Sequence, residues 1–153
     1  MDLILWRHAE AHVLRDGQTD LERALTTKGE RQAHRMAEWL NQRMAHSTRV
    51  IVSPALRCQQ TARALSRNFK TVDALGPEQS AQDLLTAARW PELTEPVLVV
   101  GHQPTLGLVA ARLICELPQP WSVKKGAVWW LRDRGRDEGA RVVLLAVQSP
   151  DFL

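Results

Sequence analysis

The chain has 153 residues and a mass of 17.3 kDa, enough for one domain with a hydrophobic core of its own. Its 20 Lys and Arg residues against 17 Asp and Glu residues give a net charge of +3, and because the basic residues are scattered along the chain, the sequence does not indicate nucleic-acid binding. We find neither a signal-peptide pattern nor an apolar run of the roughly 20 residues that a membrane span needs, and with only two cysteines we expect a cytoplasmic protein without a disulfide framework.

In the first half of the chain, short apolar segments alternate with amphipathic ones. Residues 3–6 (LILW) are predicted to form a buried strand, and residues 27–45 a helix, because apolar side chains recur there at helical spacing. Residues 50–52 (VIV) predict a second strand. Pro54 suits the first turn of a helix, so we expect a second helix that begins there and includes Leu65.

The second half carries five more patterned segments, at 81–88 (helix), 96–100 (strand), 104–113 (helix), 127–131 (strand) and 142–147 (strand). The last two flank a charged turn at 133–139 and are predicted to form either a hairpin or two neighbouring strands of a sheet.

This alternation of apolar strands with helices predicts an α/β fold, a three-layer α/β/α sandwich around a mostly parallel sheet. No repeat or linker divides the chain, so residues 1–153 are predicted to form a single domain. Ligands in such folds bind beyond the carboxyl ends of the strands. Because three polar stretches directly follow strands, we expect one edge of the sheet to gather Arg7, His8, Arg57 and His102 into one pocket.

Two catalytic motifs are excluded by their spacing. A zinc-protease motif needs His-Glu-x-x-His on a helix, but Glu10 stands midway between His8 and His12, and the first histidine ends a strand beside Arg7. We therefore expect no metal ion and no cofactor. A cysteine phosphatase needs an arginine that closes a phosphate loop, and the nearest one after Cys58 comes one residue too early.

A nucleophilic histidine remains as the chemistry that these residues suit. An imidazole can attack a phosphoryl group, and water can then hydrolyse the phosphohistidine that forms, so that one difficult step becomes two easier ones. Phosphoryl transfer needs mainly positioning and positive charge around the phosphoryl oxygens. Arginine suits this need because its planar fork pairs with two oxygens and keeps its charge.

Four motifs, in this order along the chain, resemble those of the histidine phosphatase superfamily, which includes the phosphoglycerate mutases. They are LWRHAEA (5–11), DLERALTTKG (20–29), VSPALRCQQTA (52–62) and VVGHQP (99–104). The chain is most similar to the small SixA-like branch of phosphohistidine phosphatases, and the resemblance covers residues 1–115. It implies a phosphoglycerate mutase-like fold in a minimal form.

The resemblance also implies a role for each member of the predicted pocket. His8 would be the nucleophile that becomes phosphorylated, and Arg7 and Arg57 would hold the phosphoryl oxygens. His102 would complete the pocket by donating a hydrogen bond to an oxygen and so stabilising the transition state. All four residues stand at the positions of the family's motifs.

Three further positions carry open alternatives. Arg23 contacts the substrate at the pocket rim or forms a salt bridge that fixes its loop. Ser53 shapes the pocket or caps the helix that follows it. Ala9 stands where the superfamily usually has glycine, and we interpret it as a marker of the SixA-like branch, although alanine disfavours positive φ.

The sequence offers two candidates for a catalytic acid, Glu78 and Glu10, neither in a convincing motif, and Glu78 also fits the start of a helix. Phosphate esters need such an acid because an alkoxide is a poor leaving group. A phosphohistidine needs it less, because its imidazole can leave as a neutral molecule. A missing acid would therefore point to phosphohistidine as the substrate.

The short length leaves little chain for a lid, and an uncovered site would admit a side chain on the surface of another protein. We therefore expect a phosphohistidine phosphatase that acts on a phosphotransfer protein of a bacterial signalling relay or phosphotransferase system, without nucleic acid or membrane as partner. The alternatives are a small-molecule phosphomonoesterase of the same superfamily and a catalytically idle phosphoprotein-binding module.

Overall fold

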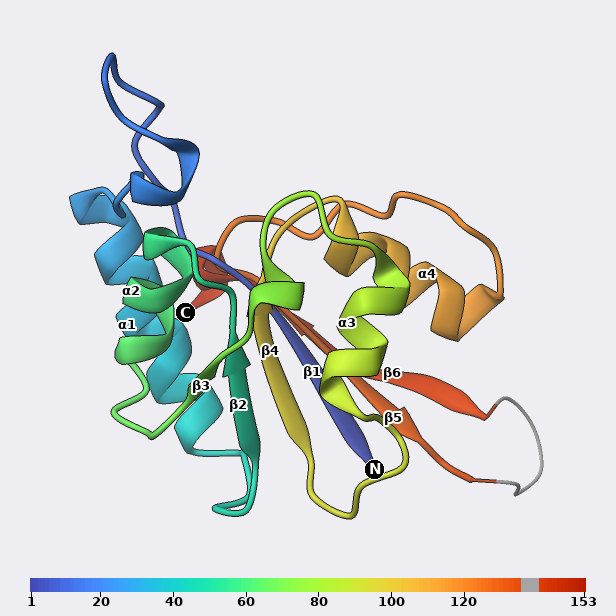
Figure 1. Ribbon diagram of the computed structural model, residues 1–153. Coiled ribbons are helices and arrows are strands. Elements are labelled where there is room, and N and C mark those ends of the chain that lie inside the picture. Colours follow the sequence, from blue (N-terminus) through green and yellow to red (C-terminus); the bar gives the residue numbers. More distant parts are fainter. Residues whose placement is uncertain (136–140) are drawn as a thin grey trace.

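One mixed sheet organises the chain in a computed structural model that describes residues 1–135 and 141–153 (Figure 1). The strands stand in the order β3-β2-β4-β1-β5-β6, and within the described residues the first four are parallel and the last two antiparallel to their neighbours. The strands are β1 (Asp2–Arg7), β2 (Arg49–Val52), β3 (Lys70–Thr71), β4 (Val97–Gly101), β5 (Val128–Asp133) and β6 (Val142–Gln148). This is the predicted α/β class with a mostly parallel sheet.

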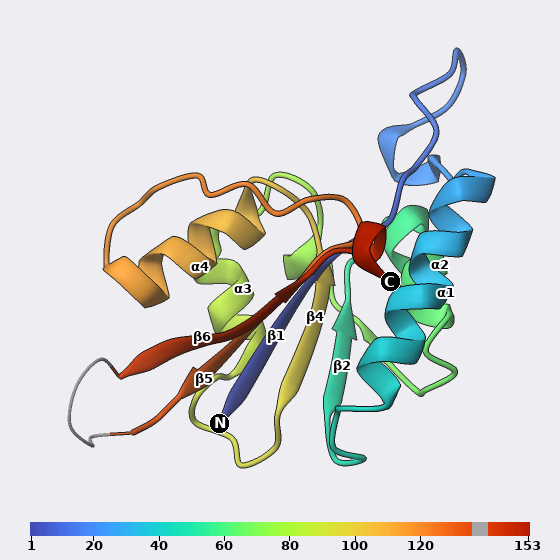
Figure 2. The same cartoon turned by 180° about the vertical axis from the view of Figure 1, so that it is seen from behind.

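Helices cover both faces of the sheet (Figures 1 and 2). The helices are α1 (Thr27–Asn41), α2 (Leu56–Arg63), α3 (Ala81–Ala88) and α4 (Thr105–Cys115), with short 3-10 turns η1 (Asp20–Glu22), η2 (Asp73–Leu75) and η3 (Pro150–Phe152). On one face, α1 and α2 pack over the sheet, and on the other face α3 and α4 do so. Within the described residues, no helix is both long and apolar enough to cross a membrane.

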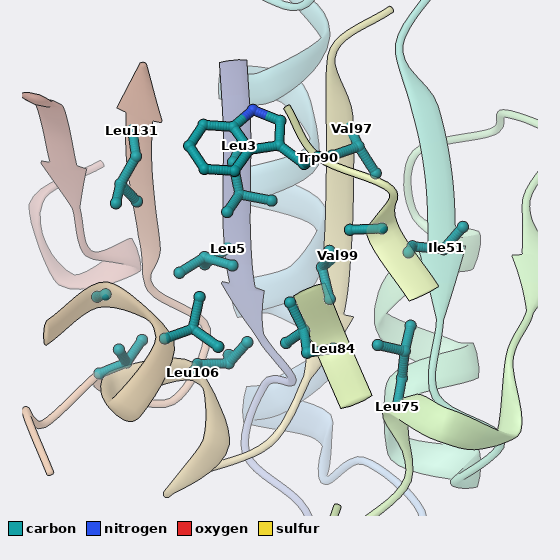
Figure 3. Close-up of a cluster of buried hydrophobic side chains, with 14 of the residues drawn as sticks. Leu3, Leu5, Ile51, Leu75, Leu84, Trp90, Val97, Val99, Leu106 and Leu131 are labelled. Atoms are coloured by element: carbon teal, nitrogen blue, oxygen red, sulfur yellow. The ribbon is translucent and has the colours of Figure 1, made fainter. Parts of the chain in front are cut away.

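The central strands are apolar on both faces through their middle, where helices cover both sides of the sheet. Along β1, Leu3 and Leu5 belong to the core beneath α3 and α4, which Figure 3 shows. Ile4 and Trp6 point the other way, into the core beneath α1 and α2. Each such side chain is fully buried, which is worth roughly 1.5–3 kcal/mol for a leucine or an isoleucine. The continuous run LILW therefore builds both layers at once.

The predicted segments differ from the structure mainly at their ends. The first helix ends at Asn41 rather than 45, and the second begins at Leu56, so Pro54 precedes that helix instead of occupying its first turn. The strand β3 was not predicted because its two residues are exposed and carry no hydrophobic pattern. β5 and β6 are the expected antiparallel neighbours. Of the predicted turn at 133–139, residues 136–140 lie outside the described residues.

Three parallel strands end together at the edge where the candidate residues lie. In the register of the sheet, Arg7 is opposite Gly101, and Trp6 and Val52 are both opposite Val100. The residues that follow these strands therefore emerge side by side. The segment between β1 and α1 extends beyond the sheet at this same end (Figure 1).

Candidate active site

Two histidines face each other where β1 and β4 end. His8 directly follows β1, His102 directly follows β4, and their ring centroids lie 5.3 Å apart. Both side chains are buried, with only 6% and 4% of their residues' surface exposed. The strand register thus brings together two imidazoles that are 94 positions apart in the sequence.

The hydrogen bonding of His8 leaves one ring nitrogen for chemistry. Nδ1 lies 2.8 Å from the carbonyl oxygen of Ala9, and because a carbonyl only accepts, Nδ1 carries the proton. Burial, assisted by the charge of Arg57, lowers the pKa of His8 to about 4, so the ring is neutral at pH 7. A neutral ring with its proton on Nδ1 has a lone pair on Nε2, which is the requirement for a nucleophile.

Ala9 packs in a small cluster of buried apolar side chains, and its backbone is not strained. It is fully buried and packs against Leu25 and Ala33, and its N–H donates to Oγ1 of Thr61 over 3.1 Å. Its φ is not positive, so this loop does not require glycine here. The methyl group that distinguishes the chain from the usual Arg-His-Gly pattern fills space between the loop and α1.

Two arginines, Arg7 and Arg57, contribute positive charge to the pocket. Arg57 lies on the first turn of α2 and is only 3% exposed, and Nη2 lies 3.3 Å from Nδ1 of His102. Arg7 donates from Nη1 to the carbonyl of Val123 over 2.9 Å. Burial, and to a smaller extent the positive charge of Arg57, lowers the pKa of Arg7. Such a pair attracts an oxyanion.

Ser53 is a partner of His102 and not the cap of α2. Its Oγ lies 2.7 Å from Nε2 of His102 and also accepts from the N–H of Ala55, which is the N-cap residue. The N-cap alternative for Ser53 is therefore wrong. Because Arg57 donates to Nδ1, Nε2 donates to Ser53, and this fixes the orientation and tautomer of the ring. Burial lowers the pKa of His102 to about 3, and the charges of His8 and Arg57 contribute to this.

Asp20, for which the sequence predicted no role in the site, joins Arg57 of α2 to Arg23. Its carboxylate accepts from Nη2 of Arg57 over 3.0 Å and from Nε of Arg23 over 2.9 Å. Burial raises the pKa of this carboxyl, but the hydrogen bonds from the two arginines outweigh it and hold the pKa below its usual range. Of the two roles predicted for Arg23, the structure shows the salt bridge, which Arg23 forms with Asp20. Arg23 also donates to the carbonyl of His12. Asp20 is the first residue of the second motif (20–29), and this position was the sign in the sequence that it belongs to the site.

Thr61, in the third motif (52–62), also supports the site, although the sequence predicted no role for it. Its Oγ1 donates to the carbonyl of Arg57 one helical turn earlier and accepts from the N–H of Ala9. The hydroxyl thus ties the loop after His8 to α2. The four-residue spacing between Arg57 and Thr61 was the available sign that both lie on one face of the helix.

Cys58 lies beside the pocket but cannot serve as its nucleophile at neutral pH. Its Sγ is 3.4 Å from Nε2 of His102, and burial raises the pKa of the thiol to about 12. The thiol therefore keeps its proton, whereas a nucleophilic cysteine must be a thiolate. Within the residues that the structure describes, no three His, Cys, Asp or Glu side chains are grouped as a metal site would require.

The two candidate acids, Glu10 and Glu78, are not bonded to the histidine pair in the described part of the chain. Glu10 accepts from Oγ1 of Thr26 over 3.1 Å and lies 3.7 Å from Nζ of Lys28, so its carboxylate faces the start of α1. Glu78 lies in an exposed turn before α3, whose N-cap is Ser80, so it is not in the first turn of that helix as expected. In the described part of the chain, neither carboxylate has a hydrogen bond or ion pair with His8 or His102.

Comparisons with known proteins agree with this geometry. The family model described as the histidine phosphatase superfamily (branch 1) matches residues 3–77. Phosphohistidine phosphatase SixA of Escherichia coli is 32% identical over 127 residues, which cover 74% of each chain. An uncharacterised protein of Picosynechococcus is 36% identical over 114 residues, 70% of this chain and 69% of that protein.

A solved structure extends the likeness to nearly the full length. The protein histidine phosphatase SixA complexed with tungstate superimposes with a TM-score of 0.79 at 25% identity, covering 99% of both chains. This confirms the phosphoglycerate mutase-like fold that the motifs implied. Together with the family model and the E. coli relative, it shows that the chain is a phosphatase that belongs to the histidine phosphatase superfamily, among its SixA-like members.

Proposed function

We propose that this phosphatase removes phosphoryl groups from histidine on a phosphotransfer protein, through a phospho-His8 intermediate and without a metal ion. The observation that carries the proposal is the hydrogen bond from Nδ1–H of His8 to the carbonyl of Ala9, because it leaves the lone pair of the neutral ring on Nε2. The likeness to the E. coli phosphohistidine phosphatase supports the substrate class. We also propose that it acts in the cytoplasm, on a partner in a signalling relay or phosphotransferase system.

In the first step, Nε2 of His8 attacks the phosphorus and the bond from phosphorus to the substrate imidazole breaks. With a proton on its other nitrogen, the substrate imidazole takes the electron pair and leaves as a neutral ring, so no acid is needed at the leaving atom. Arg7 and Arg57 hold the phosphoryl oxygens, and their fixed charges stabilise the transition state. The proton on Nδ1 of His8 stays on that nitrogen throughout and is donated to the carbonyl of Ala9.

In the second step, water attacks phospho-His8 and the P–N bond breaks toward Nε2. The products are dihydrogen phosphate and a neutral His8, so this step also balances without an outside proton. Ser53 and Arg57 fix His102 at the pocket wall beside His8, and we propose that it contacts the phosphoryl group from there. Its low pKa belongs to the free pocket, and a bound dianion raises that pKa by opposing charge.

The positions of the carboxylates favour phosphohistidine over a phosphate ester. Glu10 is committed to Thr26 and Lys28, and Asp20 is committed to Arg57 and Arg23. An ester would need one of them, or Glu78, to protonate its leaving oxygen. The small-molecule phosphomonoesterase therefore ranks second and depends on Glu78.

The test is a substrate panel in the presence of chelator. We expect the protein to dephosphorylate a phosphohistidine-bearing phosphotransfer protein faster than sugar phosphates, and His8→Ala to abolish turnover. His34→Ala, at an exposed position of α1, is the matched control and should keep full activity. Faster turnover of the esters would support the phosphomonoesterase, and binding of the phosphoprotein without turnover would support a binding module. Full activity of His8→Ala would contradict the mechanism.

A further inference from the structure

A groove adjoins the catalytic pocket at the carboxyl edge of the sheet. It has a volume of about 430 Å³ and runs between η1 and the turn that joins η2 to α3. Two of its lining residues connect the groove to the catalytic residues. Asp20 is the ion-pair partner of Arg57, and Pro54 follows Ser53, which holds His102. Whatever enters the pocket with its phosphoryl group therefore leaves its remaining atoms beside this groove.

The charge of the groove is opposite to that of the pocket. Its lining includes the carboxylates of Asp20, Asp73 and Glu78 and, among the described residues, no lysine or arginine. Asp20 is paired with arginines, whereas the side chains of Asp73 and Glu78 are exposed and face solvent. In a chain whose net charge is +3, a negative groove next to a positive pocket forms a local contrast that a substrate can match.

The wall of the groove is apolar where it meets the loop. Leu21 lines it and is 47% exposed, and Pro54 and Pro77 add apolar surface. Glu78 is held at a φ of 71°, a left-handed conformation that favours glycine. The backbone conformation of this turn favours a residue without a side chain, but the position carries the long acidic side chain of Glu78.

We propose that this groove binds a basic segment of the substrate protein next to its phosphohistidine, with Asp73 and Glu78 as specificity-determining residues and Leu21 as the apolar contact. The inference rests on the proposed function. A phosphohistidine enters the pocket from the surface of a folded protein, so neighbouring residues of that protein must lie over the groove. Lysine or arginine there meets the two exposed carboxylates, and its alkyl stem packs on Leu21.

The experiment compares three substrates that share the reacting group. They are a phosphohistidine peptide flanked by lysines, the same peptide flanked by glutamates, and free phosphohistidine. We expect the lysine peptide to have a kcat/KM about 3- to 10-fold above that of the glutamate peptide at low salt, and the difference to shrink in high salt. The double variant Asp73→Asn/Glu78→Gln should remove the preference by raising KM for the lysine peptide with kcat unchanged.

The matched control is Glu38→Gln/Glu92→Gln, which makes the same change in net charge at exposed positions outside the groove and should keep the preference. An unchanged preference in the groove variant would overturn the proposal. A fall in kcat on all three substrates, free phosphohistidine included, would also overturn it, because Glu78 would then act in the chemistry.

A binding arm separates this proposal from the proposed function. The unphosphorylated lysine and glutamate peptides carry a fluorescent label, and their affinities for the wild type and the groove variant are measured by anisotropy. Tighter binding of the lysine peptide that is lost in the groove variant supports the groove, even if the wild type hydrolyses no phosphohistidine. Equal binding of the two peptides by the wild type contradicts the groove, even if phosphohistidine is hydrolysed.

Discussion

The carboxylate of Asp20 lies 3.0 Å from Nη2 of Arg57, and a guanidinium that would hold a phosphoryl group is therefore already paired with an anion. The backbone carbonyl of Asp20 accepts from Nη1 of the same arginine over 2.9 Å, so the contact has two points. A phosphoryl dianion entering the pocket meets an arginine whose charge is partly neutralised. We therefore expect Asp20, in η1, to lower the affinity of the pocket for its anion.

Asp20→Asn should tighten the binding of phosphate. The amide keeps the shape of the side chain but removes the negative charge that competes for Arg57, so we expect the inhibition constant for inorganic phosphate to fall about 3- to 10-fold. The measurement is competitive inhibition of phosphohistidine turnover by phosphate. Asp16→Asn, an exposed acid of the same loop, is the control and should leave that constant unchanged. Weaker phosphate binding in Asp20→Asn would show that Asp20 serves only to position Arg57.

Stability should fall as the pH drops from 6.5 toward 4, because the pKa of His8 in the folded protein is about 4 and that of the unfolded chain is 6.5. Well above pH 6.5 neither state binds the proton, so this group contributes no pH dependence there. Below pH 6.5 the unfolded state binds a proton that His8 of the folded state does not bind, and this lowers the free energy of unfolding by about 2 kcal/mol at pH 5. His102, whose pKa is lowered to about 3, acts in the same direction.

Urea denaturation at pH 7 and pH 5 measures this effect. We expect His8→Asn to lose less stability than the wild type between the two values, because the variant lacks the group that titrates. His34→Asn, at an exposed position, should behave like the wild type. An identical pH dependence of the wild type and His8→Asn would contradict the lowered pKa of His8.

Ser53→Ala should reduce kcat more than it raises KM. The hydroxyl is fully buried and receives the Nε2–H of His102 over 2.7 Å, so its loss frees the ring to rotate and leaves a buried donor without its acceptor. We expect kcat to fall about ten-fold through misplacement of His102, with a loss of about 1–3 kcal/mol in stability. Steady-state kinetics and urea denaturation check both numbers. A variant with wild-type kcat would show that Ser53 does not position His102.

Most of the site could be predicted from the sequence because its members directly follow strands or stand in short motifs. A strand end fixes where the next residue emerges. His8 and His102 follow the two apolar runs that form β1 and β4, and they could therefore be predicted to lie close together. Asp20 opens the second motif, but its pairing with Arg57 could not be predicted from strand ends, because it depends on how the segment that carries η1 contacts α2. The strand β3 was missed for a related reason, since two exposed residues become a strand only by pairing with β2.

Gly29→Ala should damage the site from a distance. Gly29 lies in the first turn of α1, and a Cβ built there would come 2.0 Å from the carbonyl oxygen of Glu10, which is backbone and cannot move aside as a flexible side chain could. The loop after His8 must then separate from α1 and lose the hydrogen bond from the N–H of Thr26 to that carbonyl. We expect a loss of about 2–4 kcal/mol in stability and a fall in kcat/KM, measured by urea denaturation and phosphohistidine turnover.

The matched control for this variant is Gly17→Ala. Gly17 has a positive φ in the exposed part of the same loop, with no atom within 4 Å of an added Cβ, so its substitution strains the backbone without any collision. We expect it to cost about 1 kcal/mol and to leave kcat/KM unchanged, because the Glu10 segment stays docked on α1. If Gly29→Ala proved as mild as Gly17→Ala, the close contact between the loop and α1 would not be what holds Ala9 and His8 in place.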